Sequence, residues 1–340
     1  MNQSNQQQAS QRLVSVVVIG RNEGERLLRC LESIQAMHTD GFQTEIIYVD
    51  SASTDGSPAK ATELGAQVID VRPERPSAAL GRNAGWRAAK GEFILFLDGD
   101  TLLHPDFVAT ALTSMINPEI AIVWGHRREI APDQSVYVRV LDLDWIYPPG
   151  KSEFCGGDAL MRRDVLEAVD GFDATLIAGE EPELCRRIRT LGHIILHIDA
   201  PMTLHDLAIN RFAPYWKRAF RAGHAYAEVA HRFRHSSDPF WLAETQRNQL
   251  HGGALLVAPW FFAAALTQPW LAGGLLLGGL ALLGRSAHRC AWKTPSLNTR
   301  LLYAVHSHFQ QIPILFGQVA WRLDAWRGRP RHLIEYKQTP

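Results

Sequence analysis

Four apolar runs alternate with helix-like segments in the first hundred residues, and this alternation restricts the fold more than any other feature of the chain. Continuous β-branched runs are typical of strands buried on both faces of a parallel sheet. The predicted strands cover residues 13–20, 44–50, 67–71 and 92–100, and the predicted helices cover residues 22–37, 57–66 and 77–91. The pattern predicts an α/β fold with a doubly wound, mostly parallel sheet and right-handed crossovers.

Polar side chains gather where the predicted strands end. Asn22 and Glu23 follow the first strand, Asp50 ends the second, and Asp98 and Asp100 end the fourth. Ligands of such sheets bind beyond the carboxyl ends of the strands, so these residues predict a site there. Asp98 and Asp100 would repel each other in a low dielectric unless a divalent cation lay between them. The sequence favours such a metal site over the alternative, a pair of solvated loop acids.

Asp50 opens a polar segment that continues with Ser53, Thr54 and Asp55. A carboxylate at a strand end can accept hydrogen bonds from a nucleobase or a ribose. We expect Asp50 to contact a ligand, and the other three residues to cap the helix that follows.

The composition excludes some classes of protein. Lys+Arg and Asp+Glu number 35 each, so no overall positive field favours nucleic acid as a partner. The four cysteines are widely spaced without a CxxC pair, which argues against a disulfide scaffold and a zinc cluster. Residues 1–12 are polar and Gln-rich, and we interpret them as a disordered leader rather than a targeting signal. The catalytic part is therefore expected in the cytoplasm.

The composition of the chain changes after the predicted α/β domain, from alternating strands and helices to helical segments. Residues 13–210 are interpreted as one catalytic domain, with residues 118–205 as its acceptor-side half. Residues 211–251 form a basic, aromatic, helical connector. Its basic residues at 211–235 predict either a docking face for anionic lipid or lipid diphosphate, or a solvated helix face.

Residues 252–284 contain no charged side chain. As one helix they would span about 50 Å, longer than the ~30 Å hydrocarbon core but short for two crossings of ~20 residues each. Basic residues on both sides favour a hairpin or re-entrant pair with both ends on the cytoplasmic face. A single tilted span and a buried helical pair are the alternatives. Residues 285–340 are amphipathic and predict either an interfacial helix or packing on the catalytic domain.

Five segments occur in the order and at the spacing of family 2 glycosyltransferases of the GT-A fold, which the chain resembles over roughly residues 13–230. They are VSVVVIGRNEGERLLRCLESI, IIYVDSASTDGS, GRNAGWRAAKGEFILFLDGDT, GGDALMRRDVLEAVDGFD and GEEPELCRRIRTLG. The resemblance implies a nucleotide-sugar donor, Mg²⁺ or Mn²⁺ held on the donor diphosphate by the DGD triplet, and inversion at the anomeric carbon.

The resemblance also implies roles for individual residues. Asp50 resembles the acid that contacts the nucleobase, and Arg82 with Asn83 resembles the pair along the nucleotide. The loop at residues 156–158 resembles the one that lines the donor sugar and the acceptor. The predicted nucleotide-sugar residues are Asn22, Glu23, Asp50, Arg82, Asn83, Asp98, Gly157 and Asp158, and the predicted metal ligands are Asp100, Asp98 and His205. For His205, a structural hydrogen bond is the alternative.

The acid pair Glu180-Glu181 departs from the family pattern, which usually has Glu-Asp with the Asp as general base. Glu181 aligns with the base, and Glu180 is the second choice. A carboxylate suffices to deprotonate an acceptor hydroxyl. The alternative is that these acids only offset the dipole of a helix N-terminus. Residues 215–220 lack the Gln-x-x-Arg-Trp sequence of processive members, which favours transfer of a single sugar.

The sequence therefore predicts a membrane-associated inverting glycosyltransferase on the cytoplasmic face of the inner (plasma) membrane, acting on a lipid-linked or cell-envelope glycan acceptor. A nucleotidyltransferase of similar α/β fold is one alternative, but GRNEGERL is a poor match to its Gly-rich basic loop. A non-catalytic glycan-binding relative is the other, and it would be expected to lack the triplet or the acid pair.

Overall fold

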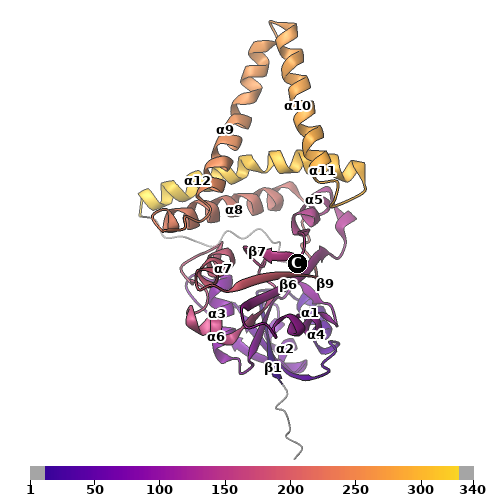
Figure 1. Cartoon of the computed structure of the whole chain (residues 1–340), viewed down its shortest axis with the longest axis vertical. Coiled ribbons are helices and arrows are strands. Elements are labelled where there is room, and N and C mark those ends of the chain that lie inside the picture. Colours follow the sequence, from indigo (N-terminus) through magenta and orange to yellow (C-terminus); the bar gives the residue numbers. More distant parts are fainter. Residues whose placement is uncertain (1–11, 329–340) are drawn as a thin grey trace, which may run out of the picture.

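The computed structural model describes residues 12–328, and its first half follows the predicted alternation (Figure 1). The predicted leader falls almost entirely outside the described residues, and Arg12 already belongs to the first strand. The strands are β1 (Arg12–Gly20), β2 (Phe42–Asp50), β3 (Gln67–Asp70) and β4 (Phe93–Asp98), and the helices between them are α1 (Glu25–Gln35), α2 (Ser57–Glu63) and α3 (Ala78–Ala88).

The second half of the α/β domain completes one mixed sheet. Its elements are β5 (Thr101–Leu103), α4 (Phe107–Ser114), β6 (Ile120–Glu129), η1 (Pro132–Gln134), α5 (Val136–Asp142), η2 (Leu143–Trp145), β7 (Gly150–Ser152), β8 (Ala159–Arg162), α6 (Arg163–Ala168), α7 (Glu180–Thr190) and β9 (Ile194–His205). The strand order is β3-β2-β1-β4-β8-β6-β9-β5, with β7 paired to β9. The β3-β2-β1-β4 and β6-β9 pairings are parallel, whereas β8, β5 and β7 pair antiparallel. The predicted α/β fold with a mostly parallel sheet is confirmed, with antiparallel pairings added in the second half.

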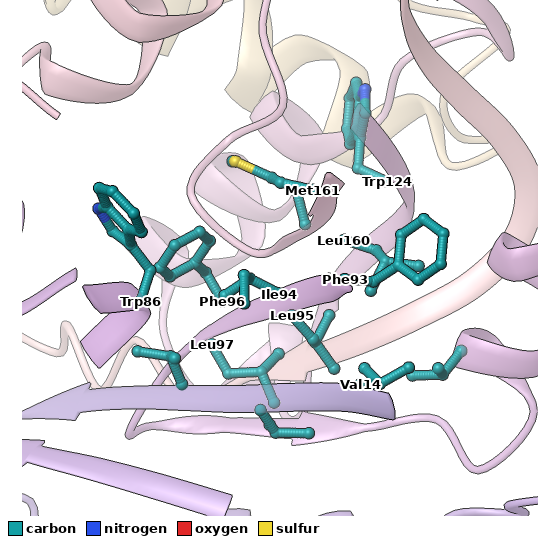
Figure 2. Packing of buried hydrophobic residues seen from close by; sticks show 14 of the residues in the cluster. Val14, Trp86, Phe93, Ile94, Leu95, Phe96, Leu97, Trp124, Leu160 and Met161 are labelled. Atoms are coloured by element: carbon teal, nitrogen blue, oxygen red, sulfur yellow. The ribbon is translucent and has the colours of Figure 1, made fainter. Parts of the chain in front are cut away.

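The apolar run of β4 lies in the middle of the core (Figure 2). Successive side chains of a strand point to opposite faces, so Phe96 lies near Trp86 and Met161 while Leu95 and Leu97 point to the other face. All five apolar side chains of β4, at residues 93–97, are buried. The strand is therefore covered on both sides, and the position of the acids at its end is fixed by the packing behind them.

Residues 212–326 are mostly helical, and their helices form a layer across one end of the α/β domain (Figure 1). Its helices are α8 (Phe212–Phe233), α9 (Leu242–Ala265), α10 (Pro269–Arg289), α11 (Leu297–Phe309) and α12 (Gln311–Trp326). In Figure 1, α8, α11 and α12 lie in the layer, while α9 and α10 project from it as a narrow hairpin. The predicted region boundaries after residues 251 and 284 fall inside α9 and α10, because the backbone hydrogen bonding of a helix continues across a change in composition.

Helices α8 and α12 touch through their backbones at two glycines. A Cβ added to Gly223 would lie 2.0 Å from the Ile314 carbonyl oxygen, and one added to Gly317 would lie 2.0 Å from the Phe220 carbonyl oxygen. Only glycine permits such an approach. The amphipathic C-terminal region thus packs against α8, and through α11 it also contacts the α/β domain.

The projecting hairpin exposes large apolar side chains. Trp260 is 77% exposed and Trp270 is 71% exposed, although such side chains are normally buried. Among the described helices, α10 is long and apolar enough to cross a membrane, and only 6% of its most apolar stretch is buried. The hairpin has the form that the sequence predicts for residues 252–284, and its outer surface has no covering protein in the described chain.

Candidate active site

A cavity of about 620 Å³ lies between the strand ends of the α/β domain and helix α8. Its walls include most of the residues that the sequence predicts for a site. The predicted residues lining it are Asn22, Glu23, Arg82, Asp98, Gly157, Glu180, Glu181 and His205, and α8 adds Arg218, Arg221, Ala222, Ala225 and Tyr226.

Arg82 joins two of the acids in this cavity. Its Nη2 lies 2.9 Å from Asp98 Oδ1, and its Nη1 lies 2.9 Å from Glu180 Oε1. Burial lowers the pKa of Arg82, but Asp98 and Glu180 outweigh burial and raise it. Gly157 has φ of 97°, and a Cβ there would lie 3.0 Å from Arg82 Nη2. The loop therefore needs glycine for its conformation, and the cavity needs it for the room beside Arg82.

Asp100 faces His205 because β5 and β9 pair with Thr101 opposite His205. The distance from Asp100 Oδ2 to His205 Nε2 is 3.4 Å, and His205 Nδ1 lies 2.8 Å from Glu129 Oε1. Glu129 Oε1 also accepts a hydrogen bond from Trp145 Nε1, so it is an acceptor and Nδ1 carries the proton toward it. Nε2 then presents its lone pair toward the Asp100 carboxylate, an arrangement that suits a metal ion between the two groups.

These donors fit a hard divalent cation. Carboxylate oxygens are the ligands that Mg²⁺ and Mn²⁺ prefer, and imidazole is compatible with Mn²⁺. Asp100 and His205 are both at least nine-tenths buried. Asp98 is ion-paired with Arg82, and in the described chain Asp98, Asp100 and His205 do not all have ligand atoms within 4.8 Å of one another. Of the predicted ligand set, the structure pairs Asp100 with His205.

Three residues that were predicted to contact the ligand form hydrogen bonds within the protein instead. They are Asp158, Asn83 and Asp50. Asp158 accepts hydrogen bonds from the Asp98 backbone N–H (3.0 Å) and from Thr203 Oγ1 (3.1 Å), and it is ion-paired with Arg127. It is fully buried behind the end of β4. The structure therefore gives Asp158 the role of positioning Asp98, rather than the predicted place against the donor sugar.

Asn83 and Asp50 are likewise engaged locally. Asn83 Nδ2 donates to the Phe172 carbonyl (2.7 Å), and its Oδ1 accepts from the Phe172 N–H (2.9 Å). Asp50 accepts from the Tyr48 hydroxyl (2.8 Å) and from the Ser53 N–H (2.7 Å). Neither is among the described residues that line the cavity. Asn83 holds the loop at Phe172, which corrects its predicted position along the nucleotide.

The loop after β1 is tied to the loop after β2. Asn22 Oδ1 accepts a hydrogen bond from the Thr54 N–H, and the Asn22 N–H donates to Ser53 Oγ, both at 2.8 Å. Glu23 pairs with Arg26 at 2.8 Å. Both predicted residues line the cavity, but their side chains chiefly fix the shape of this edge.

The acid pair begins helix α7, directly after Gly179 with φ of 83°. Glu181 Oε1 accepts hydrogen bonds from the Cys155 N–H (2.6 Å) and from Cys185 Sγ (2.9 Å). Glu180 is instead neutralised by Arg82. The two carboxylates thus have different surroundings, since neutral donors contact Glu181 and a cation contacts Glu180.

Sequence reasoning missed Arg127, Glu129 and Trp145. Arg127 donates to the Gly156 carbonyl at 3.1 Å, and its guanidinium lies 4.7 Å from the centre of the Trp145 ring. Burial lowers the pKa of Arg127, but the charges of Asp158 and Asp98 outweigh burial, so the pKa is raised above its ordinary value. The signal that could have found it is HRRE, charged residues at the end of an apolar strand, as in the DGD segment.

The basic stretch on α8 divides into two groups. Arg218 and Arg221 line the cavity. Arg232 lies on another part of the helix, where it is ion-paired with Asp173 and with Glu228, the latter at 2.7 Å. The sequence could not make this division, because it depends on which turn of α8 faces the strand ends.

Comparison with known proteins identifies the family of the α/β domain. Residues 15–170 match the family model Glycosyl transferase family 2. This part of the chain is a family 2 glycosyltransferase domain. The chain is 22% identical over 225 residues to the glycosyltransferase AglE of Haloferax volcanii, covering 64% of this chain and 73% of AglE. It is 24% identical over 262 residues to the pre-mycofactocin glycosyltransferase of Mycobacterium tuberculosis, covering 73% of this chain and 52% of that protein.

This glycosyltransferase also shares the GT-A fold with solved structures. The mannosyltransferase PcManGT from Pyrobaculum calidifontis, solved with GDP-Man and Mn²⁺, matches with a TM-score of 0.66 and 22% identity, covering 92% of this chain and 87% of that one. The chain spans about half the length of the pre-mycofactocin relative. The predicted family and fold are confirmed.

Proposed function

We propose that this glycosyltransferase is a metal-dependent, inverting enzyme that transfers a single sugar from a nucleotide-sugar donor to a lipid-linked or cell-envelope glycan acceptor. We place it on the cytoplasmic face of the inner (plasma) membrane. One observation carries the proposal: the cavity that holds Asp98 and Glu181 is lined on one side by α8, a helix of the layer from which the apolar hairpin projects.

The donor diphosphate would bind at the strand ends. Arg82, Arg218 and Arg221 line the cavity, and guanidinium groups bind phosphate oxygens through paired N–H donors. Asp98, Asp100 and His205 would hold Mg²⁺ or Mn²⁺, which supplies neutralisation of the charge on the leaving diphosphate. The GDP-Man and Mn²⁺ in the mannosyltransferase structure support this choice of donor class and cofactor.

Glu181 would be the general base. Both of its hydrogen bonds fall on Oε1, so Oε2 is the oxygen available to a proton from the acceptor hydroxyl. As the hydroxyl proton moves to Oε2, the acceptor oxygen would attack the anomeric carbon from the face opposite the diphosphate. The bond from that carbon to the diphosphate oxygen would break, the nucleoside diphosphate would leave with the electron pair, and the carbon would be inverted. Glu180 is a weaker candidate because Arg82 already compensates its charge.

The hairpin would anchor the enzyme from one side of a bilayer. Both of its helices return to the same helical layer, so a single crossing does not fit the fold (Figure 1). The charge-free part of α10, residues 269–284, rises about 24 Å, which is less than the ~30 Å hydrocarbon core. A re-entrant insertion therefore fits the dimensions better than two full spans.

A lipid-linked acceptor follows from this placement. The cavity would lie just below the membrane surface, and Arg218 and Arg221 on its α8 side suit the phosphate of a lipid phosphate or diphosphate. The acceptor hydroxyl would then reach Glu181 while the lipid tail stays in the bilayer.

The test is a donor screen with the purified full-length protein in detergent and Mn²⁺. We expect release of a nucleoside diphosphate with one nucleotide sugar, and loss of that release in Glu181→Gln with the fold intact. Release of pyrophosphate from a nucleoside triphosphate would point to a nucleotidyltransferase instead. Binding of a glycan without turnover of any donor would point to a non-catalytic relative.

A further inference from the structure

Two cysteines that lie far apart in the sequence meet beside Glu181. Cys155 Sγ and Cys185 Sγ are 3.7 Å apart, and Cys185 Sγ lies 2.9 Å from Glu181 Oε1. Cys155 precedes the glycines of the cavity loop, while Glu181 and Cys185 lie one helical turn apart on α7. The wide spacing of the cysteines argued against a zinc cluster, but the fold brings two of them together.

We propose that Cys155, Cys185 and Glu181 form a binding site for a thiophilic divalent ion such as Zn²⁺. In the described part of the chain, these residues are the one set of three or more His, Cys, Asp or Glu side chains whose ligand atoms all lie within 4.8 Å of one another. Thiolate and carboxylate are both zinc ligands, and three protein donors leave a fourth position for water, as in accessible zinc sites.

The sulfur separation matches such an ion. With Zn–S bonds of about 2.3 Å, the edge of a tetrahedron joining two sulfurs is about 3.8 Å. The observed 3.7 Å needs no movement of either sulfur. A disulfide, by contrast, would require the sulfurs to approach to about 2.05 Å. The contact between Cys185 and Glu181 must open by about half an ångström, which loss of the bridging thiol proton allows.

Both thiols are protonated before an ion arrives. Burial raises the pKa of Cys155 and raises that of Cys185 well above its ordinary value. Binding is therefore an exchange in which Zn²⁺ forms two Zn–S bonds and one Zn–O bond while two thiol protons pass to solvent. No oxidant is needed. The ion would enter through the cavity, because Glu181 lines it.

This site differs in chemistry from the one at Asp98 and Asp100. Soft sulfur donors select Zn²⁺, whereas the oxygen donors at the end of β4 suit Mg²⁺ or Mn²⁺. An ion bound to Glu181 Oε1 would draw negative charge away from Oε2 and make Oε2 a weaker base for the acceptor proton. If the proposed role of Glu181 is correct, Zn²⁺ would therefore inhibit an enzyme that Mn²⁺ activates; this consequence rests on the proposed function, whereas binding itself does not.

The test is a titration of the full-length protein in detergent with Co²⁺, under a phosphine reductant and without any sugar donor. We expect a thiolate-to-cobalt charge-transfer band that Zn²⁺ abolishes, with about two protons released per Zn²⁺ bound. Cobalt bound only at Asp98 and Asp100 would give no such band. Absence of the charge-transfer band from the wild-type protein would overturn the proposal.

Variants locate the ligands. In Cys155→Ser and Cys185→Ser we expect loss of the band and a fall in Zn²⁺ affinity of at least about 100-fold, the upper range for losing even a supporting group. Cys290→Ser is the matched control, because Cys290 is a buried free thiol between α10 and α11, and it should keep the wild-type band. Unchanged Zn²⁺ affinity in the folded Cys185→Ser protein would refute the site. If a variant fails to fold, the wild-type cobalt spectrum still decides.

Discussion

His205 Nε2 lies 3.4 Å from Asp100 Oδ2, at the point where β9 pairs antiparallel with β5. Glu129 holds the opposite ring nitrogen of His205 at 2.8 Å. Metal-binding histidines share this arrangement, in which one ring nitrogen is held by a carboxylate and the other faces the metal position.

Replacing His205 should therefore weaken the response to metal. We expect His205→Ala to raise the Mn²⁺ concentration for half-maximal activity by roughly 10- to 100-fold, as for loss of a metal-site group. The measurement is initial rate against Mn²⁺ at saturating donor. His126→Ala is a suitable control, because His126 is partly exposed and pairs with Asp199 on the strand surface. An unchanged Mn²⁺ dependence in His205→Ala would show that His205 has a structural role only.

The two acids of α7 should separate in kinetics. Glu181→Gln removes the proposed base, so kcat should fall by roughly 10²- to 10⁴-fold. Glu180→Gln removes only the carboxylate paired with Arg82, and we expect a smaller loss that appears mainly in the KM for the donor. Steady-state kinetics of both variants at one Mn²⁺ concentration make the comparison. A larger kcat effect in Glu180→Gln would exchange the two roles.

The arginines of α8 should differ by the side they face. Arg218→Gln and Arg221→Gln remove charge from the cavity, and each should raise the KM for a phosphate-bearing substrate about tenfold, the scale of one charge-assisted contact. Arg234→Gln should have little effect, since Arg234 lies at the end of α8 and donates to the His231 carbonyl. Equal effects of all three changes would indicate a general field rather than a site.

The exposed aromatic residues of the hairpin should govern membrane binding. Changing Trp260 and Trp270 to Ser removes apolar surface worth about 1.5–3 kcal/mol per side chain when buried in lipid, so vesicle partitioning should fall at least tenfold. Flotation with liposomes measures this. Turnover with a water-soluble acceptor should stay unchanged, because both residues belong to the projecting hairpin of α9 and α10 and neither lines the cavity. Unaltered flotation would remove the anchor from the proposal.

Asp144 should make the attachment of the helical layer sensitive to acid. It accepts hydrogen bonds from the Tyr303 hydroxyl (3.0 Å) and from His306 Nε2 (3.3 Å). Burial alone would raise the pKa of Asp144, but His306 and Tyr303 outweigh it and lower the pKa below its ordinary 3.8. A lowered carboxyl pKa stabilises the fold fully above the ordinary value, and the contribution is lost as pH falls through the folded value.

Asp144→Asn should thus lower the free energy of unfolding by about 1–3 kcal/mol at neutral pH, the range for a hydrogen bond to a charged group. The difference from wild type should shrink below about pH 4. Thermal unfolding across this pH range measures both effects. Asp133→Asn is the control, because Asp133 forms an exposed pair with Arg139. A difference that stays constant with pH would refute the ionic role.

The sequence predicted the parts of the fold that depend on local pattern. The β-branched run of β1 and the acids after β4 lie where periodicity and the rule for parallel sheets place them. The antiparallel entry of β8 between β4 and β6 could not be predicted, because its four residues have no distinctive pattern and are positioned by their neighbours.

The site was predictable where a side chain ends a strand and hidden where tertiary contacts decide. Asp98 and Glu181 lie in the cavity as expected. Asn83 and Asp158 sit in the expected segments, but their hydrogen-bonding groups face the chain itself, which spacing alone does not show. The meeting of Cys155 and Cys185 depends on how a loop packs on α7, which no one-dimensional pattern records.

The glycine contacts between α8 and α12 hold together two helices of the layer that borders the cavity. Gly223 and Gly317 bring the two backbones together, so α8 and α12 pack as one unit beside the cavity. If the helical layer rests on a bilayer, Glu181 works at one constant depth beneath the lipid. We expect the enzyme to act as a molecular ruler, accepting hydroxyl groups within a narrow distance of their lipid anchor and rejecting the same sugar placed farther along a glycan.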